Sequence, residues 1–110
     1  MPQLIRFLLT HTLLLASSIP FNAVALDTVT LQLKWTHSFE YAGYYAALEQ
    51  GYYRDAGLTV GIKEAQPGFD AVTEVTDGKA EYGIGSSSLI LDHKAGKPVV
   101  VIAVILQHSP

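Results

Sequence analysis

The chain contains no cysteine, which excludes both a disulfide framework and a thiolate metal site. It has no run of charges of one sign, because its seven basic and ten acidic residues are scattered along 110 positions. This pattern does not indicate nucleic acid or a membrane surface as a partner. An apolar stretch of the roughly 20 residues that span a bilayer is also missing. The chain has a single tryptophan, Trp35.

The amino terminus has the features of a secretory signal peptide. Arg6 and the free amine make it positive, and Phe7–Ile19 is mostly apolar. Ala23-Val24-Ala25 then supplies a cleavage site of the A-x-A type. A retained membrane anchor is the alternative, but the apolar segment has only 13 residues. We therefore expect residues 1–25 to be removed and the rest to reach the periplasm.

Hydrophobic periodicity in residues 26–110 predicts the order β-α-β-α-β-α-β. Val29–Trp35 alternates apolar and polar residues, as a strand does, and helical spacing follows Ser38. Helices are expected at 39–50, 52–56, 69–77 and 87–95, and strands at 59–64, 81–85 and after Pro98. A glycine marks the predicted end of each helix: Gly51, Gly57, Gly78 and Gly96.

The last predicted strand is apolar at all eight positions from 99 to 106. Its β-branched content and the preceding Pro98 favour a strand over a helix. A strand that is apolar on both faces belongs in a parallel sheet covered by helices on each side. We therefore expect an α/β fold, with a mostly parallel sheet and helices on both faces.

Parallel strands end at the same edge of a sheet, and open α/β sheets bind their ligands there. Four segments are expected to meet at this edge: Trp35-Thr36-His37, Gln66-Pro67-Gly68, Gly85-Ser86-Ser87-Ser88 and Gln107-His108-Ser109. One aromatic wall with several hydroxyls and neutral donors suits a small, flat, polar ligand that is uncharged or anionic.

Two of these segments also have purely structural interpretations. Trp35 shares the alternation of Leu31 and Leu33, so it is either a stacking wall or a core residue. One serine among Ser86, Ser87 and Ser88 is expected to cap a helix. The others, with free backbone N–H groups, would hold an acceptor or anionic group of the ligand.

The remaining polar and aromatic candidates are hydrogen-bonding residues rather than metal ligands. His37 and His108 are far apart in the sequence, and neither has a carboxylate at ligand spacing. Tyr41 and Tyr44 lie early enough in the first helix to face a cleft, and Tyr41 joins the predicted ligand set. The sequence contains no G-x-S-x-G elbow, close carboxylate pair or H-E-x-x-H motif, so no catalytic set is predicted.

Three blocks of the sequence carry a family resemblance: LKWTHSFEYAGYYAALEQGYYRDAGL, PGFDAVTEVTDGKAEYGIGSSSLIL and GKPVVVIAVILQHSP. In this order they resemble the periplasmic binding proteins that capture thiamine-pyrimidine precursors and aliphatic sulfonates. That family also includes the fungal thiamine pyrimidine synthase. The resemblance implies a lobe of the type II periplasmic-binding-protein fold, of which residues 26–110 would be an incomplete amino-terminal part.

The resemblance implies a solute-binding protein that passes a small molecule to an ABC transporter permease and needs no cofactor. Membrane contact would then come only through the transporter or a downstream anchor. A periplasmic sensory ectodomain is an alternative, because a sensor needs the same cleft. The synthase is a further alternative, but its lysine for pyridoxal phosphate falls on Gly85 and its histidine near Ser88 or Leu89. A glycine cannot form a Schiff base, so we expect a binding protein rather than an enzyme.

Overall fold

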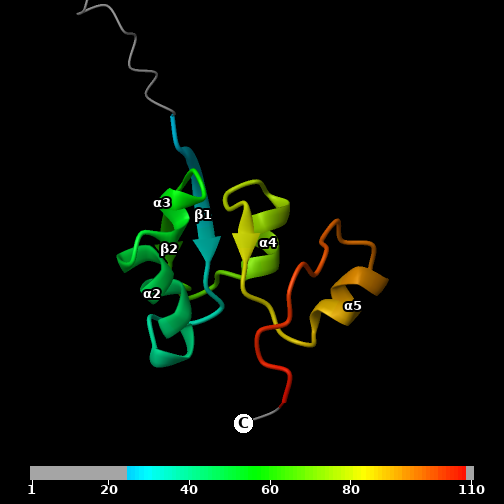
Figure 1. The fold of residues 1–110 in the computed structure, drawn as a ribbon. Helices are drawn as coiled ribbons and strands as arrows, with labels where there is room; N and C mark the ends of the chain where they lie inside the picture. The colour runs from blue at the N-terminus through cyan, green and yellow to red at the C-terminus, as the bar shows by residue number, and fades with distance from the viewer. Residues whose placement is uncertain (1–24, 109–110) are drawn as a thin grey trace, which may run out of the picture.

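The computed structural model describes residues 25–108, in which a small open sheet is flanked by helices (Figure 1). The elements are β1 Asp27–Gln32, a 3-10 helix η1 Phe39–Tyr41, α2 Ala42–Glu49, α3 Tyr52–Asp55, β2 Leu58–Lys63, α4 Ala71–Thr76, β3 Tyr82–Gly83 and α5 Leu89–Lys94. The predicted α/β class is confirmed. The predicted signal peptide, up to Val24, lies outside the described residues.

The sheet is parallel throughout and has the order β2-β1-β3, so the first strand lies in the middle. β1 pairs with β2 along its whole length, from Asp27 opposite Leu58 to Gln32 opposite Lys63. Its other edge pairs with β3 only through Leu31 opposite Tyr82 and Gln32 opposite Gly83. The chain therefore moves to one side of β1 and then crosses back to the other.

Helices cover both faces of this sheet, as predicted. Leu31 and its partner Tyr82 point to one face, and the next residue of β3, Gly83, points to the other. Tyrosines of η1 and α2 pack with Leu31 on the first face. On the second face, a Cβ atom added to Gly83 would lie 3.1 Å from Val75 Cγ2 of α4.

The buried core is a compact cluster on the first face. Leu33 has no exposed surface, and Leu31 and Tyr41 are buried beside it. Partly buried side chains from the neighbouring elements surround them: Tyr44, Tyr45, Val60, Ile62 and Ile84. The four predicted helix ends are also confirmed in their backbone, because Gly51, Gly57, Gly78 and Gly96 all have positive φ.

The prediction of a fourth strand is wrong for this structure. Residues 99–108 form no strand, and Val100 and Ile102 are 84% and 74% exposed. A strand needs backbone partners along an edge, and β3 offers only two ladder residues. The first predicted strand is also shorter, because the ladder ends at Gln32 and residues 34–37 form a bend.

Asp70 caps α4 and should make stability depend on pH. Its Oδ2 accepts hydrogen bonds from the N–H and hydroxyl of Thr73, at 3.1 and 2.9 Å. Burial raises the pKa of Asp70, but these hydrogen bonds outweigh it and hold the pKa below its usual value. A carboxylate with a lowered folded-state pKa stabilises the fold above its unfolded-state pKa and loses this effect as pH falls through the folded-state value.

We expect Asp70→Ala to lower the free energy of unfolding by about 1 kcal/mol near neutral pH, as loss of a helix cap does. The difference should shrink below pH ~4, where the carboxyl of the unfolded chain begins to take up its proton. Urea denaturation at several pH values measures this. Asp70→Asn is the control, because it retains an acceptor oxygen but cannot titrate. Equal pH dependence of the native and Asn chains would contradict the prediction.

Candidate functional site

The strand order reverses at the carboxyl ends of β1 and β3, and this edge of the sheet, called the strand-end edge, carries the candidate site. From β1 the chain turns towards α2 and β2, whereas β3 lies on the opposite side of β1. In open α/β sheets, ligands bind at such a reversal of strand order. The bend at residues 34–37 and the segment 85–88 leave the sheet at these two adjacent strand ends. The structure thus brings three of the predicted segments to the same edge, because Gln66-Pro67-Gly68 follows β2, which also pairs in parallel with β1.

Trp35 lies in the first segment with its side chain open to solvent. The residue is 67% exposed, so the interpretation as a core tryptophan is wrong. Its backbone is held at the sheet edge, because the Ala65 N–H donates to the Trp35 carbonyl at 3.0 Å. The exposed indole on an anchored backbone provides a flat apolar surface at the strand-end edge.

His37 is tied to two other elements. Its Nδ1 shares a hydrogen bond with the Tyr45 hydroxyl of α2, with the rings edge to face and 5.7 Å between centroids. Its backbone N–H donates to Glu64 Oε2 at 3.2 Å. The same carboxylate lies 3.8 Å from His37 Nε2, a contact that is ionic only when the ring is protonated. No pattern in the sequence predicts Tyr45 or Glu64 as partners of His37, although Glu64 ends the predicted second strand.

The serine segment forms an exposed turn before α5. Ser86 Oγ and Ser88 Oγ are 2.9 Å apart, and the Ser88 N–H donates to Ser86 Oγ at 3.4 Å. Ser88 occupies the N-cap position of α5, but its side chain makes no capping hydrogen bond. Ser87 is exposed between them. Gly85 is packed closely, since a Cβ atom there would lie 2.8 Å from Leu89 Cγ.

The two remaining predicted residues lie elsewhere. Tyr41 is 2% exposed and packs in the core instead of facing the opening. Burial, with the adjacent Glu40, raises the pKa of its hydroxyl, which has no hydrogen-bond partner among the described residues. His108 is exposed near the end of the 99–108 segment. Within residues 25–108 it makes no hydrogen bond to the other predicted site residues.

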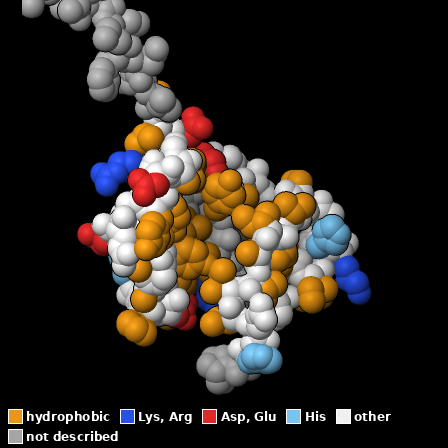
Figure 2. Space-filling view, viewed as in Figure 1, with side chains coloured by type: hydrophobic (Ala, Val, Ile, Leu, Met, Phe, Trp, Pro, Cys, Tyr) orange, Lys and Arg blue, Asp and Glu red, His pale blue; other side chains and the backbone are white. Residues whose placement is uncertain are grey.

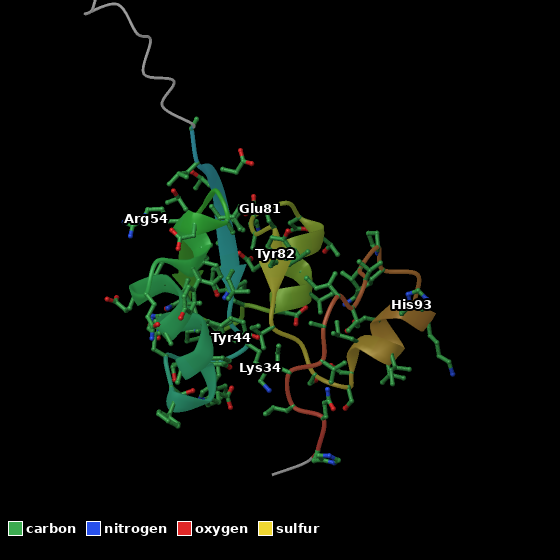
Figure 3. The ribbon with its side chains drawn as sticks, in the orientation of Figure 1. Lys34, Tyr44, Arg54, Glu81, Tyr82 and His93 are labelled. Atoms are coloured by element: carbon green, nitrogen blue, oxygen red, sulfur yellow. The ribbon has the colours of Figure 1, made fainter. Side chains whose placement is uncertain are left out.

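Lys34 is a further polar residue at this edge that is absent from the predicted ligand set. It follows Leu33 at the exit of β1, and Figure 3 shows it below Tyr44, towards the end to which the β1 and β3 arrows point. Its side chain forms no ion pair within the described part of the chain. The signal was present in the alternation of Thr30, Gln32 and Lys34, which placed it on the face opposite Leu33. Lys34 adds one cation to an edge that also carries the Glu64 carboxylate.

An apolar cavity lies apart from most of these polar groups. It has a volume of about 480 Å³ and lies between the sheet and the segment that follows α5. Its walls are mainly apolar, as Figure 2 shows in the hollow between the side with α2 and α3 and the side with α5. The walls include Leu31, Val60, Val99, Ile102 and Ile105. Of the predicted ligand residues only Gly85 lines it.

Residues 25–108 contain neither a candidate metal site nor a membrane-spanning helix. No three side chains of histidine, aspartate or glutamate lie close enough together to hold a metal ion. No helix in this range is both long and apolar enough to cross a bilayer.

Comparison with known families identifies the family to which the chain belongs. The family described as NMT1/THI5-like matches residues 38–110, about two-thirds of the sequence. The chain belongs to this family. No curated protein and no solved structure matches the chain.

Membership of the NMT1/THI5-like family confirms the predicted resemblance. It indicates a function of the binding-protein kind, or one related to the thiamine pyrimidine, with a small molecule as ligand. The matched residues include the serine segment and the start of α5. Trp35 and His37 precede the matched span. Their position at the strand-end edge is therefore supported by the strand pairing and not by the family match.

Proposed function

We propose that the chain is the amino-terminal part of an exported solute-binding protein that captures a thiamine pyrimidine precursor for ABC-type uptake. The observation that carries this proposal is the exposed Trp35 indole at the reversal of strand order. The signal-like amino terminus supports a periplasmic location, with the transporter permease as the partner at the membrane.

The residues at the strand-end edge suit a planar polar ring as ligand. The Trp35 indole would stack on one face of the ring, contributing about 1 kcal/mol beyond the burial of its area. Ser86, Ser87 and Ser88 offer hydroxyl groups that both donate and accept hydrogen bonds. Lys34 would favour an acceptor or a partial negative charge on the ligand.

The residues at the strand-end edge do not fit pyridoxal phosphate bound through an imine, as it would be in the synthase. The position of the synthase lysine is Gly85, which has no side chain with which to form an imine. The space beside Gly85 is filled by Leu89, whose Cγ would lie 2.8 Å from an added Cβ atom. A binding protein therefore agrees better with the site than the enzyme does.

Fluorescence of Trp35 provides the test, because it is the only tryptophan in the chain. We expect the hydroxymethyl aminopyrimidine of thiamine to quench this fluorescence as the rings stack. Trp35→Leu should weaken binding about tenfold or more by calorimetry, corresponding to at least ~1.4 kcal/mol.

Tyr52→Leu is the matched control. Tyr52 is also an exposed aromatic residue, but it lies on α3 and not at the strand-end edge. Its affinity should remain that of the native chain. Binding without a change in fluorescence, together with full affinity in Trp35→Leu, would refute the assignment of Trp35 to the site.

A further inference from the structure

The exits of β1 and β2 are tied together by a buried side-chain amide. Gln32 is 1% exposed, and its Nε2 donates to the carbonyl oxygens of Leu33 at 3.0 Å, Glu64 at 3.2 Å and Lys63 at 3.4 Å. Among the described residues the Oε1 of this buried amide has no hydrogen-bond partner, so Nε2 alone fixes the two strand ends relative to each other. It also fixes the backbone from which the Glu64 side chain projects.

The bend that carries Trp35 is anchored to the same few residues. The Ala65 N–H donates to the Trp35 carbonyl at 3.0 Å, and the His37 N–H donates to Glu64 Oε2 at 3.2 Å. Gln66 Nε2 lies 3.5 Å from the other oxygen of Glu64. The bend has no strand ladder of its own, so these contacts, together with the hydrogen bond between His37 Nδ1 and the Tyr45 hydroxyl of α2, hold it in place.

The Glu64 carboxylate is free for this role because its neighbour serves the other face of the sheet. Successive residues of an extended segment point to opposite faces. Lys63 lies 3.9 Å from Glu74 of α4, whereas Glu64 contacts the bend through His37. A bond from a backbone N–H to a carboxylate is charge-assisted and stronger than a neutral one.

We infer that Glu64 is a positioning residue that orders the Trp35–His37 bend and so presents the indole ready for its ligand. What the indole binds rests on the proposed function, whereas the ordering of the bend does not. An exposed tryptophan has few packing contacts, so its orientation depends on its backbone anchors. Ordering the bend before binding removes part of the entropy that a ligand would otherwise have to overcome.

The test is the time-resolved fluorescence anisotropy of Trp35 in the full chain without ligand. Glu64→Ala and the milder Glu64→Asp both withdraw the carboxylate from the His37 N–H, so the indole should show a larger amplitude of fast motion. Glu64→Gln should rescue most of the order, because its amide oxygen can still accept this bond. Glu49→Ala is the matched control, as Glu49 is an exposed glutamate of α2 that lies outside this network.

Equal anisotropy in the native, Asp and Gln chains would overturn the inference, and far-UV circular dichroism checks that each is folded. If the Ala variant does not fold, the comparison of Asp with Gln still decides. By calorimetry, Glu64→Asp should weaken aminopyrimidine binding about three- to tenfold, a loss of preorganisation. A native chain that binds no aminopyrimidine would count against the proposed function, while the anisotropy would still test the role of Glu64.

Discussion

Replacing Leu33 with alanine is expected to lower the free energy of unfolding by about 3–5 kcal/mol, the largest effect of any single core truncation here. Leu33 has no exposed surface and packs at the centre of the cluster with Leu31 and Tyr41. The cavity left behind would be lined by the side chains that now pack around Leu33, including Leu31 and Tyr41. Because small domains are stable by only ~5–15 kcal/mol, much of the variant should be unfolded at 37 °C.

Urea denaturation followed by far-UV circular dichroism measures this loss. Leu48→Ala is the matched control, because Leu48 lies on α2 and is 38% exposed. We expect it to cost less than about 1.5 kcal/mol, since its side chain leaves water only in part. Similar losses in the two variants would mean that Leu33 is not at the centre of the core.

Replacing Gly83 with valine is expected to lower the free energy of unfolding by about 1–3 kcal/mol through overpacking. An added Cβ atom would lie 3.1 Å from Val75 Cγ2 and 3.2 Å from the backbone carbonyl oxygen of Ala71. A carbonyl oxygen moves only with its helix, so α4 would have to shift away from β3. The two-residue ladder of β3 gives little resistance to such a shift.

Gly61 provides the comparison, because it too is a strand glycine. A Cβ atom at Gly61 of β2 would have the Val29 carbonyl oxygen, at 4.0 Å, as its nearest neighbour. Valine fits a pleated strand better than glycine does, so Gly61→Val should leave stability unchanged or raise it. Chemical denaturation of both variants tests the contrast. Equal effects would contradict the packing of α4 against β3.

The order of the elements could be predicted because local signals are strong in this sequence. Alternation in β1 and the glycine after each helix depend on residues a few positions apart, and the structure confirms them. The segment 99–106 has an equally strong apolar pattern, yet it forms no strand. Whether such a segment becomes a strand depends on backbone partners and covering helices, which its own residues do not encode.

The candidate site was predictable in place but not in detail. The rule that parallel strands end at one edge predicted that the segments after β1 and β3 leave the sheet at neighbouring strand ends, as the strand pairing shows, while the binding role of Trp35 and the serines stays a prediction. Alternation could not decide whether Trp35 is buried, because the strand ends three residues before it. The partnership of His37 with Glu64 joins residues 27 positions apart, so it becomes visible only once β1 and β2 are aligned.

The central place of β1 has a consequence for how the domain assembles. The first strand to emerge during synthesis has both edges open until its neighbours arrive, and its first neighbour is the six-residue strand β2. Closing this shorter loop costs less entropy than closing the loop to β3. The unit from β1 to β2 can therefore form as an early nucleus, with α4 and β3 added later against an existing edge. Disturbances at β3 should then mainly speed unfolding, whereas disturbances between β1 and β2 should slow folding itself.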